Sequence, residues 1–74
     1  MEMTRYFFDI RDGENIYPDK LGLELESVRA ARMDAAHMLA SLARDTDIAI
    51  EVRTEEGPLF QATFIDHVTK QFGQ

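Results

Sequence analysis

Acidic residues gather between residues 9 and 19, where carboxylates on both sides of Gly13 could form a calcium-binding loop. Such a loop needs oxygen ligands at its first and third positions and a Gly at its centre. With Gly13 as that central residue, the two ligand positions fall on Phe8 and Ile10, whose side chains cannot coordinate a cation. The segment is therefore interpreted as a solvated hairpin turn of the Asp-Gly type.

Asp34 and His37 are a second candidate pair, because residues three apart on a helix can meet. A zinc site needs further ligands, and none follows at a recognisable spacing. Ser27 and Ser41 have no base at the spacing of a catalytic triad. The four Gly residues are isolated and form no phosphate-binding loop. The sequence therefore predicts no catalytic residue, no metal ligand and no cofactor, so an enzyme is not expected.

The composition restricts the possible functions further. The chain has 74 residues, with 14 acidic against 8 basic side chains and no Cys, which excludes a disulfide scaffold, a thiol nucleophile and a Cys-ligated zinc site. The net charge of -6 repels the phosphates that a nucleic-acid-binding surface must attract. No run of about 20 apolar residues could span a membrane, and the first residues lack a signal-peptide pattern. A cytoplasmic protein is expected.

Alternating apolar residues predict strands on both sides of one Ala-rich helix. Tyr6, Phe8 and Ile10, for example, share one face of the first strand. Ser27 is placed to cap the helix by accepting a hydrogen bond from its first turn. The predicted elements are strands over residues 5–11, 15–17, 48–54 and 59–65, a helix over 28–44, an extended lead-in at 23–25 and a short helix at 66–72.

The order strand, strand, helix, strand, strand indicates a single α+β domain of ββαββ type over residues 1–74. One helix can cover one face of a four-stranded sheet. An antiparallel sheet with this connectivity has the strand order 2-1-3-4. The predicted core combines one face of each strand with one side of the helix: Tyr6, Phe8, Ile10, Val28, Ala31, Ala35, Leu39, Leu42, Ile50, Val52, Phe60 and Phe64.

The opposite face of the sheet also carries apolar residues, namely Phe7, Ala49, Leu59 and Ile65. Large apolar groups on an open sheet face often mark an interface. A chain this short has a small core, and oligomerisation is a common source of additional stability for such domains. The sequence therefore predicts a homodimer whose interface includes these four residues.

Four segments resemble a known family of small bacterial domains of unknown function. They are Arg-Tyr-Phe-Phe at residues 5–8 followed by Arg-Asp-Gly at 11–13, the stretch Asp-Lys-Leu-Gly-Leu-Glu-Leu at 19–25, Ala-Ala-Arg at 30–32, and the hairpin at 51–57. The resemblance covers nearly the whole chain. Asp9 departs from the pattern, since many members are expected to have His there. The resemblance implies a small proteobacterial cytoplasmic protein, and it brings no activity, substrate or catalytic residue.

These features leave three functions to compare. The first is a non-catalytic protein-interaction module, a homodimer that binds another protein through a strand edge, where free backbone groups need no special side chains. The second is a nucleic-acid-binding regulator in which Tyr6 and Phe7 stack on bases, against which the net charge argues. The third is an enzyme, for which so short a chain has little room for a pocket of about 300–1,000 Å³. The sequence favours the interaction module.

Overall fold

The computed structural model describes residues 2–42 and 48–63, and its elements follow the alternating and helical patterns of the sequence. They are β1 (Thr4–Asp12), β2 (Asn15–Tyr17), β3 (Leu23–Leu25), α1 (Val28–Leu42), β4 (Ile48–Thr54) and β5 (Gly57–Thr63). The helix predicted at 66–72 and the last two residues of the strand predicted at 59–65 lie outside the described residues.

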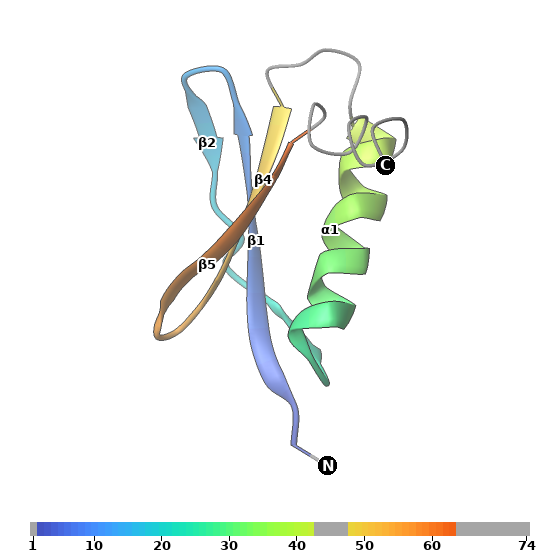
Figure 1. The fold of residues 1–74 in the computed structure, drawn as a ribbon. Coiled ribbons are helices and arrows are strands. Elements are labelled where there is room, and N and C mark those ends of the chain that lie inside the picture. Colours follow the sequence, from blue (N-terminus) through green and yellow to red (C-terminus); the bar gives the residue numbers. More distant parts are fainter. Residues whose placement is uncertain (1, 43–47, 64–74) are drawn as a thin grey trace.

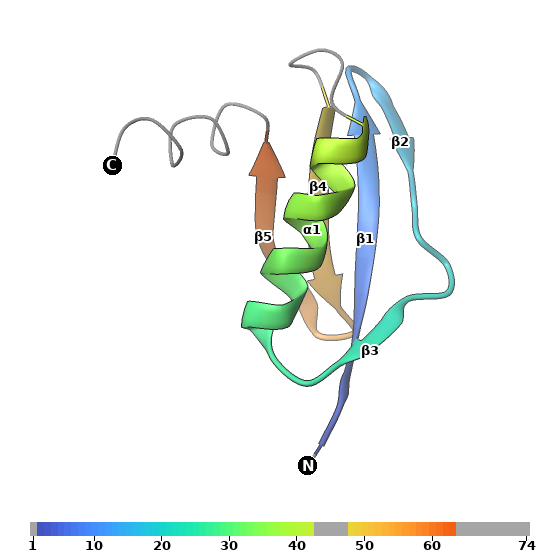
Figure 2. The same ribbon diagram turned by 90° about the vertical axis from the view of Figure 1, so that its right-hand side faces the viewer.

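β1 is the central strand of an open antiparallel sheet (Figure 1). β4 pairs with one edge of β1, and β5 pairs with the far edge of β4. β2 and β3 pair with two successive stretches of the other edge of β1 (Figure 2). The predicted sheet of four strands in the order 2-1-3-4 is therefore corrected to five strands, because the expected lead-in pairs with Thr4–Tyr6 as β3.

α1 begins with the cap that the sequence predicts. Ser27 Oγ accepts a hydrogen bond from the N–H of Ala30 at 3.1 Å, and the Ser27 carbonyl accepts one from Ala31 at 3.2 Å. Ala31, Ala35 and Leu39 follow one another at intervals of one turn and are buried, so α1 packs on the sheet through a stripe that begins with two small side chains. Within residues 2–42 and 48–63, no helix is both long and apolar enough to cross a membrane.

The core lies between α1 and the strands β1 and β4. Its buried members are Tyr6, Phe8, Ala31, Ala35, Leu39, Ile48, Ile50 and Val52. Two further residues predicted for the core, Val28 and Leu42, are 41% and 40% exposed, because they occupy the first and last positions of α1. Phe64 lies outside the described residues. The core is therefore narrower than predicted and is centred on the pairing of β1 with β4.

Candidate functional site

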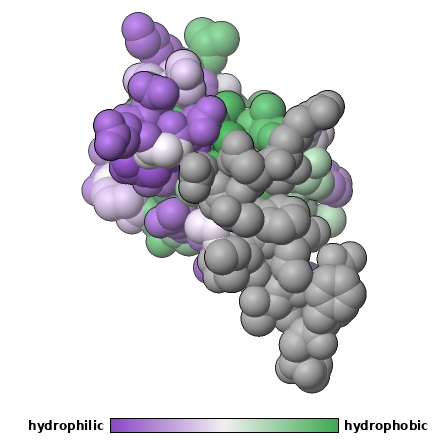
Figure 3. All heavy atoms as spheres, turned by 90° about the horizontal axis from the view of Figure 1, so that it is seen from above, coloured by the Kyte–Doolittle hydropathy of each residue, from purple (hydrophilic) through white to green (hydrophobic). Residues whose placement is uncertain are grey.

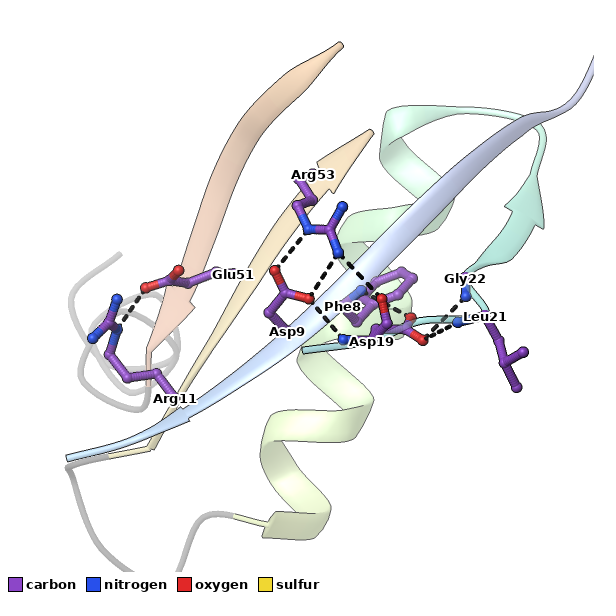
Figure 4. A network of polar contacts seen from close by, with 8 residues as sticks. All are labelled: Phe8, Asp9, Arg11, Asp19, Leu21, Gly22, Glu51 and Arg53. Carbon is purple, nitrogen blue, oxygen red and sulfur yellow. Dashed lines mark hydrogen bonds and ion pairs between the residues drawn. The ribbon is translucent and has the colours of Figure 1, made fainter. Parts of the chain in front are cut away.

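The edge of β1 that points away from β4 has a gap between its two short partner strands, β2 and β3. Asp19 fills that gap. β2 pairs with residues 10–12 and β3 with residues 4–6, so neither strand reaches the N–H of Phe8. Asp19 Oδ2 accepts this N–H at 3.1 Å, while Oδ1 accepts the N–H groups of Leu21 at 3.1 Å and Gly22 at 3.0 Å. The Asp19 carboxylate therefore attaches the loop between β2 and β3 to the central strand (Figure 4).

Arg53 of β4 reaches across the same face and binds both Asp9 and Asp19. Its Nε donates to Asp9 Oδ2 at 2.8 Å, and its Nη2 donates to Asp9 Oδ1 at 3.4 Å and to the Asp19 carbonyl at 3.2 Å. Asp9 Oδ1 also accepts the N–H of Asp19 at 2.8 Å. The guanidinium carbon lies 4.5 Å from the centre of the Phe7 ring, in cation–π contact. We call Asp9, Asp19 and Arg53 the Asp19 clamp (Figure 4).

The environment of the clamp changes the pKa of two of its groups. Burial raises the pKa of Asp19, but the backbone hydrogen bonds from Gly22, Phe8 and Leu21 and the charge of Arg53 together bring it below its ordinary value. The side-chain hydrogen bond to Asp9 raises the pKa of Arg53. Asp19 and Arg53 are therefore both ions at neutral pH, and the charged forms are the ones that the hydrogen bonds require.

Gly22 lies at the end of the loop that the clamp holds. Its backbone conformation and its close neighbours both disfavour a residue with a side chain at this position. Its φ is +75°, in the left-handed region that favours Gly. A Cβ built there would lie 2.8 Å from Cγ of Arg5 and 3.0 Å from Cε2 of Phe7. The loop therefore approaches β1 more closely than any residue with a Cβ permits.

Further ion pairs cover the face of the sheet that lies away from α1. Arg5 Nη2 lies 3.0 Å from Glu24 Oε2, and Arg11 Nε lies 2.7 Å from Glu51 Oε2. Seen from above, most of the visible surface on the side away from α1 is hydrophilic (Figure 3). Together with Arg53, these guanidinium groups are already bound by carboxylates of the same chain, so they are less available for phosphates.

The structure places the four residues predicted as an interface in different environments. Phe7 is half-buried beneath Arg53, and Ala49 is 5% exposed. Leu59 is 47% exposed, and Ile65 lies outside the described residues. Leu59 is the most exposed of the three described residues, and an interface formed by all four stays a prediction.

A shallow hollow of about 510 Å³ lies beside Leu59, near the start of β1. Three apolar residues far apart in the sequence line it, Met3, Val28 and Leu59, which are 54%, 41% and 47% exposed. Glu55 and Glu56, from the turn between β4 and β5, line it as well. Its volume falls within the range of about 300–1,000 Å³ that is common for ligand sites, which is more room than the chain length predicts.

The outer edge of β5, where Gln61 is exposed, is a second candidate surface. Among the described residues, β5 pairs with β4 alone, and its seven residues include no charged side chain. The register shifts between Val52 and Arg53, so Leu59 is an extra residue in a β-bulge. Edge strands are commonly protected from pairing by charges, Pro residues or bulges. β5 has Pro58 and the bulge near its beginning, and neither feature over residues 60–63.

The structure assigns no catalytic or metal-binding arrangement to the other candidate residues of the sequence that it describes. Ser27 caps α1, and no hydrogen bond joins Asp34 to His37 in the described part of α1. In residues 2–42 and 48–63, no three His, Asp or Glu side chains are grouped as metal ligands.

Sequence reasoning treated Asp19 as part of a solvated turn and missed the clamp. The sequence feature that could have revealed the clamp is Asp19 three residues before Gly22. An Asp at such a position can accept the backbone N–H groups of the residues that follow it.

Known proteins offer one point of comparison. No curated protein and no solved structure matches the chain. A family model described as a domain of unknown function (DUF6894) matches residues 5–65. The match includes the Asp19 clamp and nearly all of the sheet and α1. It confirms the resemblance to a family of domains of unknown function. The chain therefore belongs to the DUF6894 family.

Proposed function

We propose that the protein is a small non-catalytic interaction module that works as a homodimer and binds other protein chains. The exposed apolar group around the hollow carries this proposal. Met3, Val28 and Leu59 come from three separate parts of the sequence and gather at one place, each more than 40% exposed. Large apolar side chains that are exposed close to one another often mark protein–protein contact sites.

The charges around the hollow support a protein partner over a nucleic acid. Glu55 and Glu56 make no ion pair within the described residues, so this rim is negative and favours basic side chains in a partner. Arg5, Arg11 and Arg53, in contrast, are engaged by carboxylates. A gel shift at low salt tests the alternative: we expect no retarded nucleic acid, and retardation by the folded protein would favour a nucleic-acid-binding regulator.

Light scattering coupled to size-exclusion chromatography tests the homodimer. We expect the measured mass to rise with concentration from the 8.5 kDa of one chain toward twice that value. A mass that stays at one chain up to high micromolar concentration would refute the homodimer.

Leu59→Ser tests the exposed apolar group, with Leu21→Ser as its control, since Leu21 is 82% exposed in the loop before β3. Leu59→Ser should move dimer formation to higher concentration, and Leu21→Ser should leave it unchanged. Equal behaviour of the two variants would show that the surface at Leu59 is not part of the interface.

A further inference from the structure

We propose that the second copy of the chain pairs with the outer edge of β5 in antiparallel orientation, with Gln61 of one protomer opposite Gln61 of its partner. This inference rests on the proposed homodimer and names the surface that forms it. Among the described residues, β5 is the longest edge strand of the sheet, with seven residues against three each in β2 and β3. It carries no charge that would repel an identical strand.

The hydrogen-bonding pattern of the sheet determines which backbone groups of β5 face outward. In an antiparallel ladder, the N–H and C=O of one residue point to the same side, and successive residues alternate. The N–H of Phe8 points away from β4, to Asp19. Val52 lies opposite Phe8, so the backbone groups of Val52 point to β5 and bond those of Phe60. Gln61, the next residue, therefore directs its N–H and C=O to the outer edge.

Two copies related by a two-fold axis satisfy these groups reciprocally. The N–H of each Gln61 donates to the carbonyl of the other, and a closed two-fold pair leaves no copy of this edge exposed. The two five-stranded sheets become one continuous sheet, with both copies of α1 on the same face because the axis is perpendicular to the sheet. Leu59, two residues away and 47% exposed, gains the partner strand as a neighbour.

A contact made mainly by one strand from each protomer is small. Interfaces below about 1,200 Å² are typical of weak and transient complexes. The dimer should therefore dissociate on dilution in the micromolar range, where two backbone hydrogen bonds make a measurable difference to its dissociation constant.

Gln61→Pro tests the pairing directly. Pro removes the outward N–H of residue 61 and leaves the bonds of Phe60 to β4 in place, and Pro is tolerated at such a position of an edge strand. The symmetric dimer loses both central hydrogen bonds, so its dissociation constant should rise about tenfold or more. Gln61→Thr retains the N–H and should stay within about threefold of the wild type. Far-UV circular dichroism confirms that each variant is folded.

Charge exchange at the same position gives a second test that needs no Pro. In the proposed register, Gln61→Lys places two cations opposite each other and Gln61→Glu places two anions, so each variant should dimerise less than the wild type. A mixture of the two should form heterodimers more readily than either forms homodimers.

A wild-type mass that stays at one chain would refute both the homodimer and this pairing. If the wild type is dimeric, the homodimer stands. The β5 pairing is nevertheless overturned if Gln61→Pro leaves the dissociation constant unchanged, or if Gln61→Lys and Gln61→Glu mixed together form no more dimer than either variant alone.

Discussion

Asp19→Asn tests the Asp19 clamp sharply, because it replaces one carboxylate oxygen by an amide NH₂ of nearly the same size. The two oxygens of Asp19 accept three backbone N–H groups, from Phe8, Leu21 and Gly22. An amide can keep its oxygen toward Leu21 and Gly22, but its NH₂ then faces the N–H of Phe8. Turning the amide around leaves two N–H groups facing the NH₂ instead.

The expected cost follows from the better of these two orientations. One hydrogen bond to a charged acceptor is lost, and the N–H of Phe8 in the central strand has no acceptor left. We expect a loss of about 2–3 kcal/mol in the free energy of unfolding. A chain of this length has a total of roughly 4–11 kcal/mol, so the variant should stay folded with a clearly lower urea midpoint.

Urea denaturation measures this loss. The chain has no Trp, so far-UV circular dichroism is the suitable signal. Asp12→Asn is the matched control, since it makes the same chemical change at an exposed residue at the end of β1, and it should stay within about 0.5 kcal/mol of the wild type. If Asp19→Asn costs no more than Asp12→Asn, the clamp does not hold the loop as described.

Acid titration of the same variant adds an independent check. Because the pKa of Asp19 is lower in the folded chain than its ordinary value, its stabilisation is complete above about pH 4 and is lost as the pH falls through the folded pKa. Asn does not titrate. The stability difference between wild type and Asp19→Asn should therefore narrow below about pH 4, and a difference that stays constant through the acid range would contradict the role of the charge.

Two further substitutions test close packing, each by urea denaturation against a control. Gly22→Ala adds a Cβ 2.8 Å from Cγ of Arg5 at a positive φ, whereas Gly13→Ala adds one with no atom within 4 Å; the first should cost more than the about 1–2 kcal/mol expected of the second. Equal losses in the free energy of unfolding would show that the loop at Gly22 can shift to make room for a Cβ. Ala35→Leu, at a fully buried position of α1, should cost about 1–3 kcal/mol by overpacking, while Ala40→Leu at an exposed position should stay within about 0.5 kcal/mol. A tolerated Ala35→Leu would show that α1 packs less closely on the sheet than described.

Local patterns in the sequence were enough to predict much of the fold. Tyr6 and Phe8, and likewise Ile50 and Val52, recur at every second position, which identifies both the strands and their buried faces. Ser27 marks the start of α1 by its capping chemistry. Each of these features depends on residues within a few positions of one another.

The missed features depend on contacts between residues far apart in the sequence. β3 is three residues long and becomes a strand only by pairing with the beginning of β1. Asp9 and Asp19 suggested a turn, and their actual role depends on Arg53, 44 residues after Asp9 in the chain. The hollow also depends on residues far apart in the sequence. Helical periodicity predicts Val28 as a core residue, but Val28 is the first residue of α1 and is 41% exposed at the hollow.

Hydrogen exchange of backbone amides, measured by NMR across a dilution series, tests the proposed dimer most directly. Phe60 and Gln61 are neighbours in β5 whose N–H groups point to opposite edges of the strand. We predict that the Gln61 amide exchanges quickly in dilute protein and slowly in concentrated protein, while the Phe60 amide stays protected at both. Exchange of Gln61 that does not change with concentration, in a sample that scattering shows to be dimeric, would contradict the pairing of two β5 edges.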